Sequence, residues 1–200
     1  MRKASLFLLV HFLWLMVPAR PGLGHPHLAQ LDTMAEVSFA ELIAELRDRR
    51  AVFVGETHDE AAHHQAQLAI IRGLHRAGSK VAIGLEMMRR EDQDLLDLWV
   101  AGNLSSEEMG AVFRRNWGWW PLYRPIFEYA RKNGIPMLAL NVSREITAQV
   151  AREGFESLSP EQMRQLGNIS CRVAPPYEQF IRRALGDHAH GEASFRNFCE

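Results

Sequence analysis

The stretch around residue 55 has the pattern of apolar and polar residues around which the rest of the chain is organised. Residues 51–54 are apolar and favour a strand, and Gly55 then permits a sharp turn. Residues 60–76 follow with apolar side chains at helical spacing. The pattern predicts a strand, a tight turn and a helix.

Glu56 and His58 lie in the predicted turn. Residues two apart in an extended segment point the same way, so both side chains are expected to face one crevice. A carboxylate and an imidazole at the end of a strand suit a metal, a haem or general acid-base chemistry. A buried glutamate satisfied by backbone donors beside an ordinary histidine is the other interpretation. Thr57 or Asp59 is expected to cap the helix.

Two more apolar runs, residues 80–88 and 135–140, predict strands separated by helices. Strand, helix and strand at this spacing form a parallel unit, which places ligands outside the carboxyl ends of its strands. Glu86, Asn141 and Arg144 come at or just after these ends. They are therefore expected on the same rim as Glu56 and His58, although Glu86 also suits a helix cap or an ion pair with a neighbouring arginine.

The remaining apolar spacing predicts helices around this sheet. Ser38, Ser143 and Ser159 each precede such a pattern and are expected as N-caps. The expected helices begin near residues 38, 60, 90, 105, 126, 144, 160 and 178.

Residues 117–125 hold four aromatic side chains and two prolines. Such a segment suits a rigid apolar wall, a surface for a partner, or simply core. Because tryptophan is mostly buried, core is favoured on frequency alone.

The composition indicates one globular domain. The chain has 200 residues, of which 47% are hydrophobic, and a formal net charge of −1. No basic stripe with interleaved aromatic residues is present, so nucleic acid is not an expected partner.

The first residues have the layout of a secretory signal peptide. Arg2 and Lys3 precede an apolar run over residues 4–17, and small, turn-forming residues follow up to Gly24. We expect a signal peptide over 1–24, a flexible lead-in over 25–37 and one domain over 38–200. The run is short for a membrane span, which disfavours an uncleaved anchor, and no lipoprotein cysteine follows it. The expected location is the periplasm or cell envelope, with no transmembrane span in the mature chain.

Cys171 and Cys199 are the only cysteines. They can pair in an oxidising compartment, but the sequence does not show that they come close. No Cys-x-x-Cys-His motif occurs, which excludes covalent attachment of a c-type haem. His188 and His190 suit either a metal or, more often, a solvated loop.

Together, several of these motifs resemble the ChaN-like family of haem-binding, iron-regulated proteins, within the Tiki/TraB-related group. The resemblance covers roughly residues 52–152 and is carried by Gly55-Glu56-Thr57-His58-Asp59, His63-His64 with Gln67, Gly84-Leu85-Glu86-Met87 with Gln93, the segment from Trp119 to Arg124, and Asn141 with Arg144. It implies a three-layer α/β/α fold with a largely parallel central sheet. It also implies export, a homodimer holding haem noncovalently between its subunits, a tyrosine on iron, and an envelope transport partner.

The resemblance suggests which residues meet the haem. A tyrosinate ligand needs a phenol whose pKa is lowered from about 10, and guanidinium groups lower it. Tyr123, with Arg124 beside it, is the first candidate for the iron ligand, and Tyr177 is the second. The other expected haem contacts are His58, Glu86, Trp120 and Arg144.

Three departures from the family pattern are visible. The chain lacks the lipid-anchoring cysteine, and Val142-Ser143 stands where a small residue and proline are usual. The family also continues past residue 200, so we expect a domain truncated at its C-terminus.

Haem binding in haem or iron uptake, without enzymatic activity, is the favoured function. One alternative is a metal-dependent hydrolase in which Glu56, His58 and Glu86 hold a divalent cation with an open water position. Another is a nonenzymatic interaction protein whose aromatic segment docks a partner.

Overall fold

A small β-hairpin opens the part of the chain that the computed structural model describes, which is residues 28–167 and 174–185. Strand β1 (Leu28–Ala29) pairs antiparallel with β2 (Glu36–Val37). Contacts divide the chain into two units, Met1–Phe39 and Ala40–Glu200, and the hairpin belongs to the first. The hairpin lies in the segment expected as a flexible lead-in, and its turn is closed by backbone hydrogen bonds between Gln30 and residues 34 and 35.

The second unit is built on two parallel strands. Strand β3 (Ile83–Arg89) pairs with β4 (Met137–Asn141), with Ile83 opposite Met137 and an irregularity between Leu85 and Arg89. The helices of the described chain are α1 (Phe39–Leu46), α2 (Ala61–Arg76), α3 (Gln93–Val100), α4 (Ser106–Asn116), α5 (Trp120–Asn133), α6 (Arg144–Glu153), α7 (Pro160–Leu166) and α8 (Pro175–Leu185), with short 3-10 turns η1 (Arg90–Asp92) and η2 (Phe155–Ser157). The predicted α/β class with a parallel sheet is confirmed.

Capping residues explain several helix boundaries. Ser105 and Glu108 form a reciprocal capping box at the start of α4, and Ser159 with Gln162 does the same for α7. Helix α2 differs from its prediction, because Glu60 rather than Thr57 or Asp59 accepts a hydrogen bond at its N-terminus, from the amide of residue 62.

Helix α5 begins six residues earlier than the sequence pattern predicts. It starts at Trp120, and Pro121 suits its first turn because proline's missing N–H has no intrahelical partner there. Pro125 lies inside the helix. The aromatic segment is therefore mostly the first turns of a helix.

Residues 51–54 form no strand within the described chain, which corrects the prediction of a strand there. Phe53 is 95% exposed, whereas Val52 and Val54 line a pocket with residues of β3. The alternation expected of a strand is thus present without the ladder of backbone hydrogen bonds. Apolar composition favours an extended backbone, but a strand also needs a neighbour in register.

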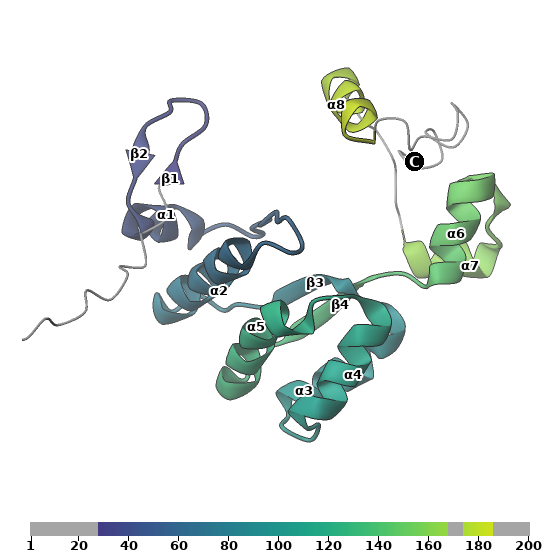
Figure 1. Ribbon diagram of the computed structural model, residues 1–200, viewed down its shortest axis with the longest axis horizontal. Coiled ribbons are helices and arrows are strands. Elements are labelled where there is room, and N and C mark those ends of the chain that lie inside the picture. Colours follow the sequence, from purple (N-terminus) through teal and green to yellow (C-terminus); the bar gives the residue numbers. More distant parts are fainter. Residues whose placement is uncertain (1–27, 168–173, 186–200) are drawn as a thin grey trace, which may run out of the picture. The chain divides into compact units, whose positions relative to one another are not determined.

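The main hydrophobic core lies between the sheet and four helices. Helices α2 to α5 contribute to it on one side of β3 and β4 (Figure 1), and its fully buried side chains include Trp99, Phe113 and Phe127. On the other face of the sheet, Leu138 and Leu140 are 46% and 53% exposed. Ile146, Val150 and Leu158 form a separate small cluster around α6 and η2.

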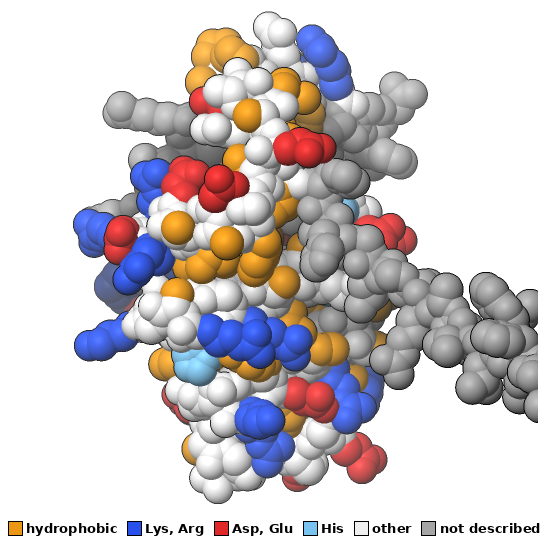
Figure 2. Space-filling view, turned by 90° about the vertical axis from the view of Figure 1, so that its left-hand side faces the viewer, with side chains coloured by type: hydrophobic (Ala, Val, Ile, Leu, Met, Phe, Trp, Pro, Cys, Tyr) orange, Lys and Arg blue, Asp and Glu red, His pale blue; other side chains and the backbone are white. Residues whose placement is uncertain are grey.

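Within the described chain, no helix is both long and apolar enough to cross a membrane. On the face in Figure 2, basic and acidic side chains are interspersed around an apolar band. This face carries no continuous basic stripe of the kind that binds nucleic acid.

Candidate functional site

A buried carboxylate, Glu56, lies at the centre of the site. Its side chain is 6% exposed and has four polar neighbours from three parts of the chain. The side chain of His58 places Nδ1 3.0 Å from Oε1, Gln67 donates to Oε2 over 2.8 Å, Tyr123 donates its hydroxyl to Oε1, and His64 places Nδ1 3.2 Å from Oε2. The side chains of Glu56 and His58 therefore lie together, as the sequence predicts for residues two apart.

Helix α2 supplies two of these neighbours because its first turns face the Glu56 segment. His64 and Gln67 are three residues apart, which places them on one side of the helix, and their side chains hydrogen-bond each other over 3.1 Å. His64 is 3% exposed, and its Nε2 lies 3.0 Å from the carbonyl oxygen of His58. The adjacent His63 points elsewhere and accepts from the amide of Thr57 over 2.8 Å. Only one of the two histidines faces the site, as expected for neighbours about 100° apart.

The hydrogen bonds keep Glu56 ionised. Burial alone raises the pKa of a carboxyl group, but here the donors outweigh it and the pKa of Glu56 lies below its ordinary value. Tyr123 contributes most to the lowering, followed by His58 and Gln67, with a smaller effect from the charge of His64.

Acidification is expected to destabilise the chain through Glu56. Because its pKa is lowered in the folded state, its contribution to stability is complete above the ordinary value of 4.5 and is lost as the pH falls through the folded value. Urea unfolding near neutral pH and at about pH 3.5 measures this loss, with Glu56→Gln as the comparison. The native chain should lose more unfolding free energy than the variant. Equal losses would assign the acid sensitivity to other groups.

The environment of Tyr123 differs from the one expected of a tyrosinate ligand. Its side chain is 1% exposed. Burial, the hydrogen bond that it donates to Glu56 and the negative charge of Glu56 all raise its pKa, which lies well above the usual range. Arg124 does not oppose this, because its guanidinium pairs with Glu128 on the surface, 2.6 Å away. The expectation that neighbouring guanidinium groups lower this pKa is therefore wrong.

An exposed corner, formed by His58 and Trp119, lies beside the buried carboxylate of Glu56. The side chain of His58 is 43% exposed, and its ring meets Trp117 edge-on, with centroids 5.0 Å apart. Trp119 is 50% exposed, with its ring centroid 6.5 Å from that of His58 and the two planes tilted by 30°. Trp119 also has a positive φ of 55°, which is uncommon for a bulky residue.

The other predicted site residues lie in different environments. Trp120 is 7% exposed and packs against Phe113 and Phe127, so it belongs to the core. Glu86 is exposed on β3, and Arg144 is exposed at the start of α6. Tyr177 is 68% exposed on α8. The cysteines and the histidines at 188 and 190 lie outside the described residues.

The predicted divalent-metal site does not form in the described part of the chain. No three of its histidine, cysteine, aspartate and glutamate side chains are gathered in a way that could hold a metal ion. Glu56 and His58 are close, but Glu86 does not complete a set with them. This arrangement does not favour the hydrolase alternative.

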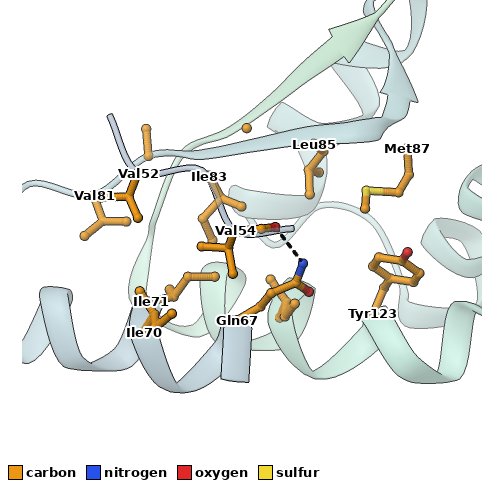
Figure 3. Close-up of a pocket in the computed structure, with 13 residues that line it drawn as sticks. Val52, Val54, Gln67, Ile70, Ile71, Val81, Ile83, Leu85, Met87 and Tyr123 are labelled. Atoms are coloured by element: carbon orange, nitrogen blue, oxygen red, sulfur yellow. Dashed lines mark hydrogen bonds between the residues drawn. The ribbon is translucent and has the colours of Figure 1, made fainter. Parts of the chain in front are cut away.

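A small apolar pocket lies beside the polar cluster (Figure 3). Val52 and Val54 line one wall, β3 and the helices line the rest, and Gln67 and Tyr123 provide its polar groups. Gln67 also donates to the carbonyl oxygen of Val54 over 3.4 Å. The volume of the pocket is about 160 Å³. Pockets that enclose a drug-sized ligand measure roughly 300–1,000 Å³, so this pocket does not enclose a porphyrin.

Comparison with known proteins identifies the family. The sequence model described as "Haem-binding uptake, Tiki superfamily, ChaN" matches residues 42–200. The chain belongs to this ChaN family. Its fold is similar to that of a ChaN chain of Campylobacter jejuni, whose structure was described for cofacial haem binding, with a TM-score of 0.65 and 18% sequence identity. The similarity covers 86% of this chain and 68% of that chain. None of the curated proteins matches the sequence.

Sequence reasoning did not identify Trp119 as the exposed ring beside His58 in this site. The aromatic segment favoured core as a whole, and Trp120 and Tyr123 are indeed buried, whereas Trp119 is half exposed. The available signal was Pro121, because a proline near the start of a helix places the residues just before it outside the helix.

Proposed function

We propose that this ChaN family member binds haem noncovalently in the cell envelope and contributes to haem or iron uptake. The observation that carries this proposal is the corner made by His58 and Trp119. An exposed imidazole held by a buried carboxylate is typical of histidines that contact a metal centre or its ligands. An exposed indole beside it provides a flat apolar surface for a macrocycle.

The residues present fit haem better than a free divalent cation. Nitrogen and phenolate ligands with aromatic surroundings suit haem iron, which already carries four ligands from its own ring. Because no three of the described histidine and carboxylate side chains are placed so that they could hold a metal ion, the described chain offers no comparable site for a bare metal ion. We therefore propose a binding protein without enzymatic activity.

We also propose a homodimer, and the size of the site supports it. The corner is open and the neighbouring pocket measures about 160 Å³, so this part of one chain covers only a fraction of a porphyrin. A second subunit would cover the remainder, which supports haem bound between two subunits. Delivery to or from an envelope transport protein is part of the same proposal.

The accessible tyrosine is the better candidate for the iron ligand. Tyr177 is 68% exposed on α8, whereas the phenol of Tyr123 is buried, donates to Glu56 and has a raised pKa. We propose Tyr177 as the iron ligand, with Tyr123 supporting Glu56. Glu86 and Arg144 are exposed and remain proposed haem contacts.

Titration with ferric haem, followed in the Soret region, tests the proposal. Saturable binding is expected, and Tyr177→Phe should abolish the phenolate-type spectrum and weaken binding about tenfold or more. Tyr123→Phe should keep that spectrum. Tyr129→Phe is the matched control, because Tyr129 pairs with His75, away from the corner.

Each other outcome has a distinct meaning. Loss of the phenolate spectrum in Tyr123→Phe alone would restore Tyr123 as the ligand. Absence of saturable binding to a chain shown to be folded would overturn the haem proposal itself.

A further inference from the structure

The contact between Glu56 and His58 fixes which ring nitrogen faces the protein. Nδ1 lies 3.0 Å from a carboxylate oxygen, which can only accept, so Nδ1 carries the hydrogen of this bond. Nε2 has no polar partner among the described residues. Since the His58 side chain is 43% exposed, Nε2 is available to a ligand outside.

Glu56 can fix the orientation of the His58 ring because its own carboxylate is fixed by other side chains. Gln67 donates to Oε2, Tyr123 donates to Oε1, and only 6% of the Glu56 side chain is exposed. A carboxylate fixed from behind determines the orientation and tautomer of the imidazole in front of it.

Trp119 forms the other half of the corner. Its backbone is left-handed, with φ 55° and ψ 34°, and its ring is half exposed. A large side chain in this conformation is strained, and such outliers cluster at ligand-binding sites. The planes of the Trp119 and His58 rings are tilted by 30°, so the two rings can face the same side of a flat ligand.

We infer that Glu56 is a positioning residue that holds His58 with Nε2 toward haem, and that Trp119 lies against the macrocycle. This inference rests on the proposed function, and it deepens that proposal by stating how Glu56 orients His58 and where Trp119 meets the ligand. Glu56 acts through His58, whereas Trp119 contacts the ligand directly.

The ligand-free chain gives the first test. Nitrogen-15 NMR of the histidine rings reports which nitrogen carries the proton, and we expect the Nδ1–H form for His58. Glu56→Gln should shift His58 toward a mixture of the two forms. Glu128→Gln, which removes an exposed carboxylate from α5, should leave it unchanged. An unchanged tautomer in Glu56→Gln would overturn the positioning role whether or not the chain binds haem.

A double-mutant cycle with ferric haem gives the second test. Glu56→Gln should weaken haem binding about tenfold, but it should have little further effect in a His58→Ala background. An equal loss in both backgrounds would show a purely structural role and overturn the inference. Glu56→Asp keeps the charge but shortens the reach, so it provides the same comparison if the glutamine variant is poorly folded.

Trp119 is tested separately with the same titration. Trp119→Ala should weaken haem binding about tenfold, and Trp119→Phe should restore most of it, because both aromatic rings present a flat face. Leu98→Ala is the control, since Leu98 is similarly exposed, at 41%, on α3. Haem binding that is unaffected by Trp119→Ala would overturn this assignment, whereas the proposed function fails only if the folded chain shows no saturable haem binding.

Discussion

Replacing Glu56 with alanine should lower the free energy of unfolding by about 3–5 kcal/mol, the cost of breaking a buried charged network by removing one partner. The carboxylate accepts from or contacts four side chains, and three of these, His64, Gln67 and Tyr123, belong to the helices that form the core. Without Glu56, the buried hydroxyl of Tyr123 loses its acceptor, and the ring of His64 loses its charged neighbour. Unsatisfied buried groups carry a large desolvation penalty.

Equilibrium urea unfolding of the native chain and Glu56→Ala measures this effect. Glu56→Gln keeps an acceptor oxygen and should lose less than the alanine variant. Glu128→Ala removes an exposed carboxylate in an i,i+4 pair and should change the free energy of unfolding by less than about 0.5 kcal/mol. A loss below about 1 kcal/mol for Glu56→Ala would contradict the network described here.

Elements defined by local signals could be predicted from the sequence. Ser159 caps α7 as the sequence predicts, and α4 begins near residue 105, where a helix is expected, with Ser105 in a capping box. Strands β3 and β4 are short apolar runs flanked by helices, and their parallel pairing follows from that order. The proximity of Glu56 and His58 also follows from local geometry, since alternate residues of an extended segment share a side.

Features that depend on distant neighbours were harder to predict. Residues 51–54 have a strand's composition, but composition does not specify a paired neighbour, and no ladder forms there. Tyr123 lies beside an arginine in sequence, yet its pKa is raised first by burial and then by Glu56, which is 67 positions away and comes close only through the packing of α5. Sequence proximity to a guanidinium therefore gave the wrong sign for the pKa shift.

The aromatic segment shows, over only a few residues, the same limit of prediction from sequence. Trp119 and Trp120 are adjacent, but one is 50% exposed and the other 7%. The difference arises because Trp119 is the left-handed residue before α5 and Trp120 is the first residue within it. Composition indicates that the segment contributes to the core, whereas the exact helix start decides which ring is left at the surface.

Phe113→Ala should also lower the free energy of unfolding by about 3–5 kcal/mol, the usual cost of deleting a fully buried aromatic ring. Phe113 is 0% exposed, and its ring lies 5.0 Å from Tyr123, 5.2 Å from Trp120 and 5.5 Å from Phe127 between ring centroids. It is the point at which α4 meets the first turns of α5. The neighbouring Gly110 shows how closely these helices pack, because a Cβ there would lie 2.8 Å from Nε1 of Trp120.

Thermal and urea unfolding measure the loss, with Phe113→Leu as the matched variant. Leucine fills most of the volume and should cost less than about 1.5 kcal/mol, so the difference between the two variants isolates the cavity. A loss of less than about 1 kcal/mol in Phe113→Ala would mean that the helices close over the cavity. Because Phe113 supports the ring of Tyr123, and Tyr123 supports Glu56, the alanine variant should also loosen the orientation of His58. The packing of the core around Phe113 thus determines how closely the orientation of the exposed His58 ring is fixed.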